Sequence, residues 1–488
     1  MRRLSLLIVA LVFLSAVSEA SAGEAVSRPP NVVVIVGDDL GWRDLGCTGN
    51  RFHETPRIDQ LAREGTRFST FYAAAPVCSP TRAALLTGNA PARIGITDFI
   101  PGHWRPFEKL AVPHNVLDLP PETVTVAEAL GAVGYRCAHF GKWHLGGQGS
   151  EPADHGFHAS FRQDGRHSIR DPGKKGAAAE TEVRTADYLA TLAESFIAEK
   201  KEQPFYLQVS HAAPHIPLNT TPELLAKYTA KPKVEGESSH PAYAGLIEEL
   251  DTSVGRLLAA LESNGLTNET IVVFTSDNGG LEREMGGWPG TVNDPLRNEK
   301  GSLYEGGVRI PCIIRWPGKI AAGRVVDSPA ITMDLLPTLL DLTGQNGRTP
   351  ARPRDGVSLA NGLTNPQATL PDRTLFWHYP HYHHSSPASA MRTGRWKLIQ
   401  FFERPATPEL YDLAADPEEA TDVASREPEV VQRLLAELGR WRHDVQAQLP
   451  TKNLAYDPKR VDEWWNRGKL VPTEPPGGRY PPAGKGSP

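Results

Sequence analysis

Residues 31–39 read NVVVIVGDD, a continuous apolar and β-branched run that ends abruptly in two aspartates. A run without polar alternation is typical of a parallel strand that is buried on both faces of its sheet. The same pattern returns in residues 270–280, TIVVFTSDNGG, where Asp277 and Asn278 follow the apolar run. The sequence therefore predicts two core strands, each of which ends in side chains that carry oxygen.

Other patterns place these two strands within an alternation of strands and helices. Apolar runs at 205–209 and 310–314 predict further strands. Apolar residues at helical spacing predict a long helix over 246–261, which Gly265 is placed to end. Shorter helices are predicted over 124–132, 183–199 and 333–342. Such alternation indicates an α/β fold with a mostly parallel sheet and helices on both of its faces.

The pattern changes near residue 371. Strand-like pieces at 395–399 and 409–413 precede an amphipathic helix near 429–447, which predicts a smaller C-terminal α+β subdomain. The polar stretch 163–181 predicts a surface loop, and the Pro/Gly-rich sequence after Pro450 predicts an irregular tail. The expected organisation is a leader at 1–22, a main domain at 28–370, a C-terminal subdomain at 371–450 and a tail at 451–488.

Composition excludes several classes of protein. Of the 488 residues, 40% are hydrophobic and 22% are charged, which excludes both a mainly disordered chain and a polytopic membrane protein. The 52 Lys and Arg residues against 57 Asp and Glu residues give a formal charge of -5, so nothing attracts the whole chain to nucleic acid or to an anionic membrane. Any binding of an anion must therefore be local.

The N-terminus has the layout of a secretory signal peptide. Two arginines precede an apolar run from Leu4 to about Val17, and small residues lead to Gly23. We expect cleavage near residue 22 and a periplasmic or secreted protein that does not stay in the membrane. The alternative is an uncleaved anchor, but this run is shorter than the roughly 20 residues that a spanning helix needs.

The polar strand ends predict a metal site. Asp38, Asp39, Asp277 and Asn278 all follow predicted strands, and ligands of open α/β sheets bind beyond the carboxyl ends of the strands. Three carboxylates and an amide oxygen at one edge would repel one another unless a hard divalent cation, Ca²⁺ or Mg²⁺, neutralised them. The alternative is that these side chains cap helices and turns, which is a common use of Asp and Asn.

A second motif begins at Cys78. The segment Cys78-Ser79-Pro80-Thr81-Arg82, followed by Ala-Ala-Leu-Leu-Thr-Gly, predicts a helix with an early proline and a terminal glycine. Cys78 would then lie at the positive end of that helix, and Arg82 would lie one turn further on. These residues indicate an activated side chain beside an anion site.

Together these motifs resemble the formylglycine-dependent sulfatases, in which the cysteine of a CxPxR motif is oxidised to an aldehyde. The resemblance covers roughly residues 30–345. Its further motifs, in chain order, are Gly141-Lys142-Trp143-His144, Pro214-His215-Ile216-Pro217, Ser276-Asp277-Asn278-Gly279, Lys300-Gly301 and Tyr304-Glu305-Gly306-Gly307-Val308-Arg309. The resemblance implies an alkaline-phosphatase-like fold and a sulfatase.

The resemblance also implies roles for individual residues. The metal, Ca²⁺ or Mg²⁺, would be held by Asp38, Asp39, Asp277, Asn278 and the oxygen of converted Cys78. The remaining active-site positions of the family match Arg82, Lys142, His144, His215 and Lys300. The hydrated aldehyde would attack sulfur, and His144 would then take a proton as sulfate leaves, while His215 and Lys300 serve the departing alcohol. A formylglycine-generating enzyme would be the maturation partner.

The substrate is the least defined part of this prediction. The segment 103–105 (His-Trp-Arg), Trp288 and the aromatic and histidine-rich segment 377–384 indicate a polar, aromatic-walled pocket, which suits a sugar ring. We expect an exo-acting carbohydrate sulfatase that acts on galactose or N-acetylgalactosamine sulfates, with aryl sulfates as surrogate substrates. The substrate contacts expected from the sequence are His211, Trp104, His378 and His381.

Two other functions remain open at this point. A phosphonate monoester hydrolase or a phosphodiesterase can use the same framework and can share the CxPxR motif. A carbohydrate-binding protein without activity is the second alternative, although every active-site position of the family is occupied in this sequence.

Overall fold

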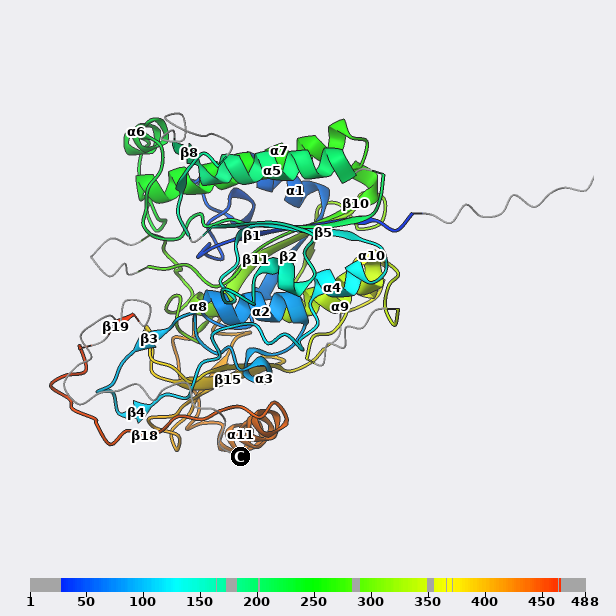
Figure 1. Cartoon of the computed structure of the whole chain (residues 1–488). Coiled ribbons are helices and arrows are strands. Elements are labelled where there is room, and N and C mark those ends of the chain that lie inside the picture. The colour runs from blue at the N-terminus through cyan, green and yellow to red at the C-terminus, as the bar shows by residue number, and fades with distance from the viewer. Residues whose placement is uncertain are drawn as a thin grey trace, which may run out of the picture.

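The computed structural model describes residues 28–463 and 465–466, except for 164, 173–181, 201, 283–289, 349–354, 366 and 371. The predicted leader at 1–22 lies outside these residues. A nine-stranded sheet forms the centre of the molecule (Figure 1). Its strands are β1 (Asn31–Gly37), β2 (Thr66–Tyr72), β5 (Arg136–Lys142), β6 (Ala159–Gln163), β9 (Phe205–Ser210), β10 (Thr270–Ser276), β11 (Arg309–Arg315), β12 (Arg324–Val326) and β13 (Ala330–Ile331).

The two strands predicted from the polar strand ends are neighbours in this sheet. The strand order is β12-β2-β11-β10-β1-β9-β5-β6, and β13 pairs with β2. Strand β1 pairs in parallel with both β10 and β9, and Gly37 lies opposite Ser276. The residues that follow these strands therefore meet at one edge. The sheet is mostly parallel, as predicted, but β11 runs antiparallel to both β10 and β2.

Helices cover both faces of the sheet, and every residue of β1 is buried. Val33 and Ile35 pack against one face, which is covered by α1 (Pro56–Glu64), α5 (Thr185–Lys200) and α7 (Pro241–Ser263). Val32, Val34 and Val36 pack against the other face, with α2 (Cys78–Thr87), α4 (Val126–Gly131) and α9 (Leu335–Leu342). Figure 1 shows these layers above and below the sheet.

A second, antiparallel sheet forms a further layer beyond α2. Its strands, in the order β14 (Leu375–Tyr379), β15 (Ala388–Thr393), β16 (Trp396–Phe401) and β17 (Glu409–Asp412), are covered by α11 (Pro428–Asp444). One face of this sheet, with Trp377 and Ile399, packs toward α2 and the central layers. The other face, with Met391 and Leu398, packs against Leu434 and its neighbours on α11. The C-terminal pattern therefore forms an α+β layer, as predicted.

Smaller elements complete the structure. They are α3 (Pro91–Ile94), α6 (Pro222–Ala230), α8 (Glu305–Val308), α10 (Ala360–Thr364), and the strand pairs β3 (His103–Trp104) with β19 (Trp465–Asn466), β4 (Leu110–Ala111) with β18 (Thr451–Lys452), and β7 (Ser168–Arg170) with β8 (Glu182–Arg184).

Two predictions about irregular segments need correction. The stretch 163–181 contains strand β7, and the tail after Pro450 contributes β18 and β19, which pair with segments more than 300 residues earlier. Two-residue strands are too short to leave a periodic signal in a sequence.

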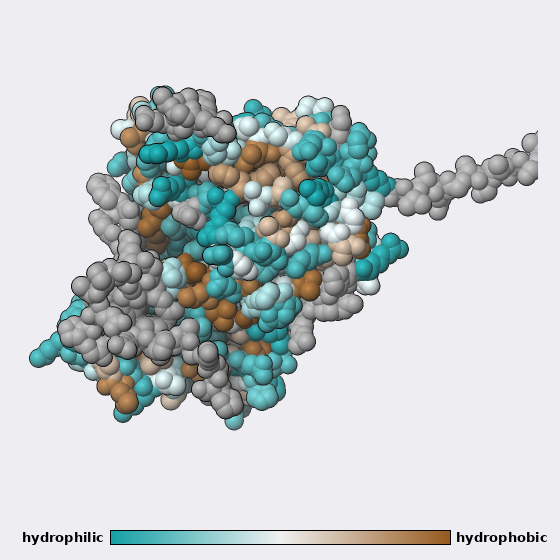
Figure 2. Space-filling model, in the orientation of Figure 1, coloured by the Kyte–Doolittle hydropathy of each residue, from teal (hydrophilic) through white to brown (hydrophobic). Residues whose placement is uncertain are grey.

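The surface of the described residues is mixed. In the view of Figure 2, hydrophilic residues cover much of the surface and hydrophobic residues show in patches between them. Among the helices that the structure describes, none combines the length and the apolar character needed to cross a membrane.

A buried ion-pair cluster joins the second sheet to the main domain. The ammonium group of Lys397 on β16 lies 2.8 Å from a carboxylate oxygen of Glu305 and 2.9 Å from one of Glu419. Glu419 also accepts the backbone N–H of Glu305 at 2.7 Å, and Tyr72 donates to Glu305 at 2.8 Å. Lys397 and Glu419 are fully buried, and Glu305 is 1% exposed. This cluster fixes the start of α8 against the C-terminal sheet.

We predict that Lys397→Met lowers the free energy of unfolding by about 3–5 kcal/mol, because it leaves two buried carboxylates without their cation. The shift of the urea unfolding midpoint measures this loss. The matched control is Arg395→Met, which removes an exposed cation paired with Asp412 two residues away from Lys397. We expect that control to shift the midpoint much less, because an exposed ion pair contributes little to stability. Equal losses in the two variants would contradict a special role for the buried cluster.

Candidate active site

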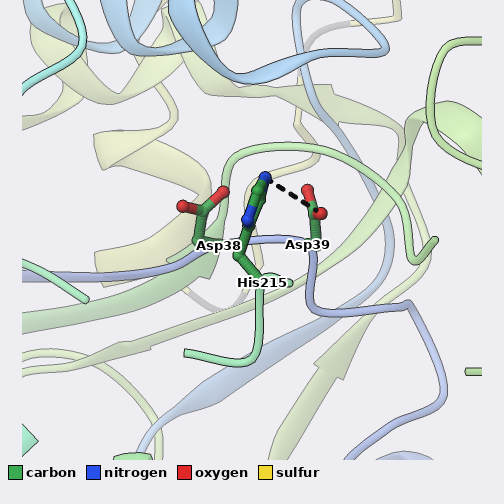
Figure 3. A group of neighbouring side chains, drawn as sticks. All are labelled: Asp38, Asp39 and His215. Carbon is green, nitrogen blue, oxygen red and sulfur yellow. Dashed lines mark ion pairs between the residues drawn. The ribbon is translucent and has the colours of Figure 1, made fainter. Parts of the chain in front are cut away.

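The metal ligands predicted from the sequence lie together at the carboxyl edge of the central sheet. Asp38 and Asp39 follow β1, and Asp277 and Asn278 follow β10. Carboxylate oxygens of Asp38 and Asp277 and the sulfur of Cys78 lie within 4.8 Å of one another. A second group, formed by Asp38, Asp39 and His215, meets the same limit. The imidazole of His215 lies between the two carboxylates in Figure 3, with a nitrogen 3.6 Å from Asp39 Oδ2.

The donor atoms of this cluster fit a hard divalent cation. Asp38 Oδ1 and Asn278 Oδ1 are both buried and have no hydrogen-bond partner among the described residues. The amide nitrogen of Asn278 donates to Asp39 Oδ1 at 2.7 Å, which turns the amide oxygen away from that carboxylate. An oxygen that is buried without a partner costs free energy unless a cation or donor satisfies it. Oxygen ligands of this kind are preferred by Ca²⁺ and Mg²⁺.

Three cations from different elements surround the carboxylates. Arg82 on α2 donates to Asp277 Oδ2 through two nitrogens at 2.9 and 2.7 Å, and to the carbonyl oxygen of Lys142 at 2.8 Å. Lys142, at the end of β5, lies 2.5 Å from Asp38 Oδ2. Lys300, in the loop before α8, lies 2.7 Å from Asp39 Oδ1. Each cation therefore has a different carboxylate as its nearest partner, and Arg82 also lies 3.8 Å from Asp38.

These contacts control the ionisation of the cluster. Burial alone would raise the pKa of Asp38, but Lys142 and the other nearby cationic groups outweigh it and hold that pKa well below its usual value. Burial, followed by repulsion from Asp38, raises the pKa of Asp277 to about 7. Burial alone would lower the pKa of Lys300, but the combined attraction of the negative groups around it, Asp39 first among them, outweighs burial and raises that pKa. The lysines are therefore charged at neutral pH, and the carboxylates are crowded.

Helix α2 presents Cys78 to this cluster. Its first residue is Cys78, and Gly88 ends it in a left-handed conformation with φ 66°. Both features agree with the predicted start and stop of this helix. Every residue of α2 is buried, and Cys78 itself is 2% exposed. Burial raises the pKa of the Cys78 thiol, so an unmodified cysteine here is neutral and is a poor nucleophile.

The two histidines of the site present different nitrogens. His144 has a left-handed backbone, with φ 57°, and its Nε2 contacts the carbonyl oxygen of Ile100. Because a carbonyl can only accept, Nε2 carries the hydrogen and Nδ1 is left as an acceptor. Burial, with the charges of Lys142 and Arg82, holds the pKa of His144 well below its usual value. His215 instead donates from Nδ1 to the carbonyl oxygen of Ile216 at 2.6 Å.

The predicted substrate contacts have other partners in the structure. His211 is buried, and its Nε2 lies 3.3 Å from Ser253 Oγ on α7. Both ring nitrogens of His378 are bonded, to Ser389 Oγ at 2.8 Å and to the carbonyl oxygen of Gln448 at 2.9 Å. His381 Nε2 lies 2.8 Å from Thr97 Oγ1. Trp104 lies in β3, and Trp288 lies outside the described residues.

Two histidines that the sequence did not single out lie beside Lys300. His384 Nδ1 contacts the carbonyl oxygen of Lys300 at 2.7 Å. A Cβ atom on Gly301 would lie 2.1 Å from Nδ1 of His383, so the absence of a side chain on this left-handed glycine makes room for that ring. The ring of His103 lies 5.0 Å from that of His383. All three belong to segments that the sequence analysis assigned to a pocket, but no periodic signal separates them from His378.

Comparison with known proteins agrees with this geometry. Residues 30–345 match the protein-family model described as Sulfatase, and residues 298–444 match "N-sulphoglucosamine sulphohydrolase, C-terminal". The chain is 34% identical to arylsulfatase A of Homo sapiens, over 85% of this chain and 88% of that protein. It is 33% identical to N-acetylgalactosamine-6-sulfatase of Mus musculus, over 79% of this chain and 74% of that protein.

A solved structure extends the comparison. The crystal structure of Ps i-CgsB in complex with k-i-k-neocarrahexaose superimposes with a TM-score of 0.70 and 27% sequence identity. The match covers 89% of this chain and 96% of that chain. The similarity therefore includes the C-terminal layer as well as the central sheet.

We predict that a divalent cation raises the thermal unfolding midpoint of chelator-stripped protein, because the cation binds the folded cluster and not the unfolded chain. At 100 times its dissociation constant, the cation contributes about 2.7 kcal/mol of stability. Scanning fluorimetry during titration with Ca²⁺ and with Mg²⁺ measures the shift. Asp38→Asn should abolish it, and Asp327→Asn, which changes an exposed aspartate, should leave it intact. A midpoint that responds to neither cation would contradict the site.

Proposed function

Because this chain belongs to the sulfatase family and is a sulfuric ester hydrolase, we propose that it removes sulfate from carbohydrate monoesters with a formylglycine at position 78 and one bound Ca²⁺. The observation that carries the proposal is the buried group of Asp38, Asp277 and Cys78, flanked by Arg82 and Lys142. Oxygen ligands, a modifiable side chain and fixed cations meet there within one small volume.

The charge distribution supports hydrolysis of an anionic ester. A sulfate monoester repels nucleophiles through its own negative oxygens, so the site must stabilise additional charge on both sides of sulfur. Arg82 and Lys142 approach the cluster from α2 and β5, and Lys300 approaches from the loop before α8. These cations are held by hydrogen bonds and ion pairs before substrate binds, so little reorganisation is needed.

Two groups that the family implies would complete the chemistry. A formylglycine supplies, as its hydrate, a hydroxyl that can attack sulfur and a second hydroxyl that allows sulfate to be expelled. A divalent cation supplies positive charge that polarises the ester. Asp38, Asp39, Asp277 and Asn278 would hold the cation, and their hard oxygen atoms favour Ca²⁺ or Mg²⁺ over zinc. We propose Ca²⁺, because the ligand set is rich in carboxylates.

His144, His215 and Lys300 have different roles in proton transfer and in charge stabilisation. His144 is neutral and has Nδ1 free to accept, which suits it to take a proton from position 78. Burial lowers the pKa of His215, so the free enzyme carries a neutral ring whose Nε2 faces Asp39. Lys300 is the charged group on that side, and it can stabilise the leaving oxygen. His215 faces Asp39, which also contacts Lys300, so His215 helps to position the groups on that side of the site.

The burial of Cys78 supports a separate maturation step. Because all of α2 is buried, an enzyme that oxidises the cysteine has to reach it before the chain folds. A formylglycine-generating enzyme is therefore the partner that we propose. The leader at residues 1–22 supports export to the periplasm or to the exterior, which follows this maturation.

Relatives and local geometry support a sugar as the alcohol part of the substrate. One relative is named for N-acetylgalactosamine 6-sulfate, and one similar structure holds a neocarrahexaose. Near Lys300, the rings of Phe99, His103 and His383 pack edge to face or tilted against one another and form an aromatic wall, with Phe99 and His103 centroids 4.7 Å apart. Such a wall suits the apolar face of a sugar, and imidazole nitrogens can bond its hydroxyls. We propose galactose or N-acetylgalactosamine sulfates as the class.

We predict that active protein carries formylglycine at position 78, which mass spectrometry of the peptide containing Cys78 measures directly. Cys78→Ser should lose turnover, because a serine hydroxyl has no partner hydroxyl to expel sulfate. Cys47→Ser, at a half-buried cysteine outside the site, is the control and should remain active. Full activity in a preparation with only unmodified Cys78 would overturn the nucleophile.

We predict that a panel of sulfated mono- and oligosaccharides contains efficient substrates, and that His383→Ala lowers kcat/KM on them at least about tenfold more than on an aryl sulfate. The reason is that His383 would contact the ring and not sulfur. His443→Ala, at an exposed position on α11, is the matched control. Equal losses on both substrates would give His383 a structural role. Faster turnover of an aryl phosphate diester than of any sulfate would favour the phosphodiesterase alternative.

A further inference from the structure

Two adjoining cavities lie at the edge of the central sheet opposite to the active site. The larger, of about 880 Å³, is bounded by α1, the second half of α7 and the loop after β11. The smaller, of about 310 Å³, lies between α1 and β12. Arg63 lines both of them, so the two cavities adjoin at this residue, and we treat them as one surface. We call this concave surface the basic groove.

The position of the groove follows from the register of the sheet. Arg315, which lines the larger cavity, pairs with Val272 near the start of β10, whereas Asp277 follows the end of that strand. Five residues of extended strand separate the two levels, which corresponds to roughly 17 Å. The groove is therefore separate from the active site, yet within reach of a ligand several sugar units long.

Most charged side chains in the groove are positive, although the whole chain has a formal charge of -5. Its acidic residues are Asp59, Glu64 and Glu262, and its basic residues are Arg57, Arg63, Arg67, Arg315, Lys319 and Arg324.

Partners account for only part of this set. Arg315 pairs with Glu64 at 2.8 Å, and Arg324 donates to the carbonyl oxygen of Gly362 at 2.6 Å. Asp59 accepts the backbone N–H of Cys47 at 2.7 Å, so it is occupied within the protein. Four cations remain whose side chains have no hydrogen bond or ion pair to the residues that the structure describes: Arg57, Arg63, Arg67 and Lys319.

One of these cations, Arg57, packs against α7 at a position where that helix has a glycine. Arg57 crosses α7 at Gly255, where a Cβ atom would lie only 2.7 Å from Cγ of the arginine. A glycine inside a helix destabilises that helix relative to alanine. Here the missing side chain allows the aliphatic part of Arg57 to lie against α7, and both residues line the larger cavity. The packing of this arginine is therefore part of the fold.

We propose that the basic groove is a second binding site, which holds a sulfated polysaccharide chain while the active site hydrolyses one of its esters. This inference rests on the proposed function. Arginine forks match the paired oxygens of a sulfate group, and several separated cations suit a polymer with repeated charges better than a single small anion. Among the described residues that line the groove none is aromatic, so the stacking surfaces that single-stranded nucleic acids use are missing there.

The test compares two triple variants of the full-length, formylglycine-bearing enzyme. Arg57→Gln/Arg63→Gln/Lys319→Gln removes three free cations of the groove. Lys233→Gln/Arg433→Gln/Arg440→Gln removes three exposed cations elsewhere and changes the net charge equally. Binding to immobilised ι-carrageenan is measured by biolayer interferometry at 50 and 200 mM NaCl, with unsulfated agarose and single-stranded DNA as competitors.

We expect the groove variant to bind ι-carrageenan at least about tenfold more weakly at low salt, and with a smaller salt dependence, while the control variant changes less than about twofold. Both variants should keep the kcat/KM of the wild type on an aryl sulfate. Equal weakening in the two variants, or DNA that competes as well as free carrageenan, would overturn the proposal. A lower unfolding midpoint with unchanged binding would also overturn it, because Arg63 would then only complement the C-terminal end of α1.

The outcomes separate this proposal from the proposed function. If the wild type releases sulfate from sugars but both variants bind carrageenan like the wild type, the groove is not a binding site and the activity stands. If the groove variant alone loses carrageenan binding while no sulfated sugar is hydrolysed, the groove stands and the carbohydrate substrate is wrong.

Discussion

Three carboxylates buried at one strand edge impose the constraint on which the rest of the structure depends. Asp38, Asp39 and Asp277 are each at most 1% exposed, and like charges so close together in a low dielectric repel strongly. The fold answers with Arg82, Lys142 and Lys300, one cation for each carboxylate. These cations come from a helix, a strand end and a loop. The packing of these three elements must therefore place each cation beside a carboxylate. A divalent cation and an anionic ester would then enter a site in which each of these carboxylates already lies beside a cation.

In the C-terminal layer, too, buried carboxylates are paired with a buried cation. Glu305 lies five residues after Lys300, and it is held by Lys397 and by the backbone contact with Glu419. Burial, offset in part by Lys397, raises the pKa of Glu419 to about 7. The loop that carries Lys300 is also held by His384, whose Nδ1 contacts the carbonyl oxygen of Lys300. The second sheet is therefore a support of the active site, because an error in its docking would move Lys300 relative to Asp39.

Sequence patterns predicted most of the fold because they report burial, and burial follows the central sheet. The apolar runs of β1 and β10, the limits of α2 and the C-terminal helix all agree with the structure. An apolar run does not encode direction, so the antiparallel course of β11 had no signal. The histidine-rich segment 377–384 shows a second limit. His378 lies within β14, and its ring bonds to Ser389 in the sheet and to the carbonyl oxygen of Gln448. His383 and His384 instead follow the strand end and lie beside Lys300 or Gly301, and only the tertiary structure distinguishes them from His378.

The two edges of the central sheet handle positive charge in opposite ways. At the carboxyl edge each cation is buried and already paired with a carboxylate. An anion is therefore attracted to it only when it is placed closely in this site of low dielectric, where salt screens the attraction weakly. At the amino edge Arg57, Arg63 and Lys319 are exposed and have no partner among the described residues, so an anion can bind there without breaking a contact, but salt screens the attraction. Selectivity for one ester and the proposed retention of a charged polymer would require these two different environments. A single sheet provides both because its strands keep their ends far enough apart for the two fields not to merge.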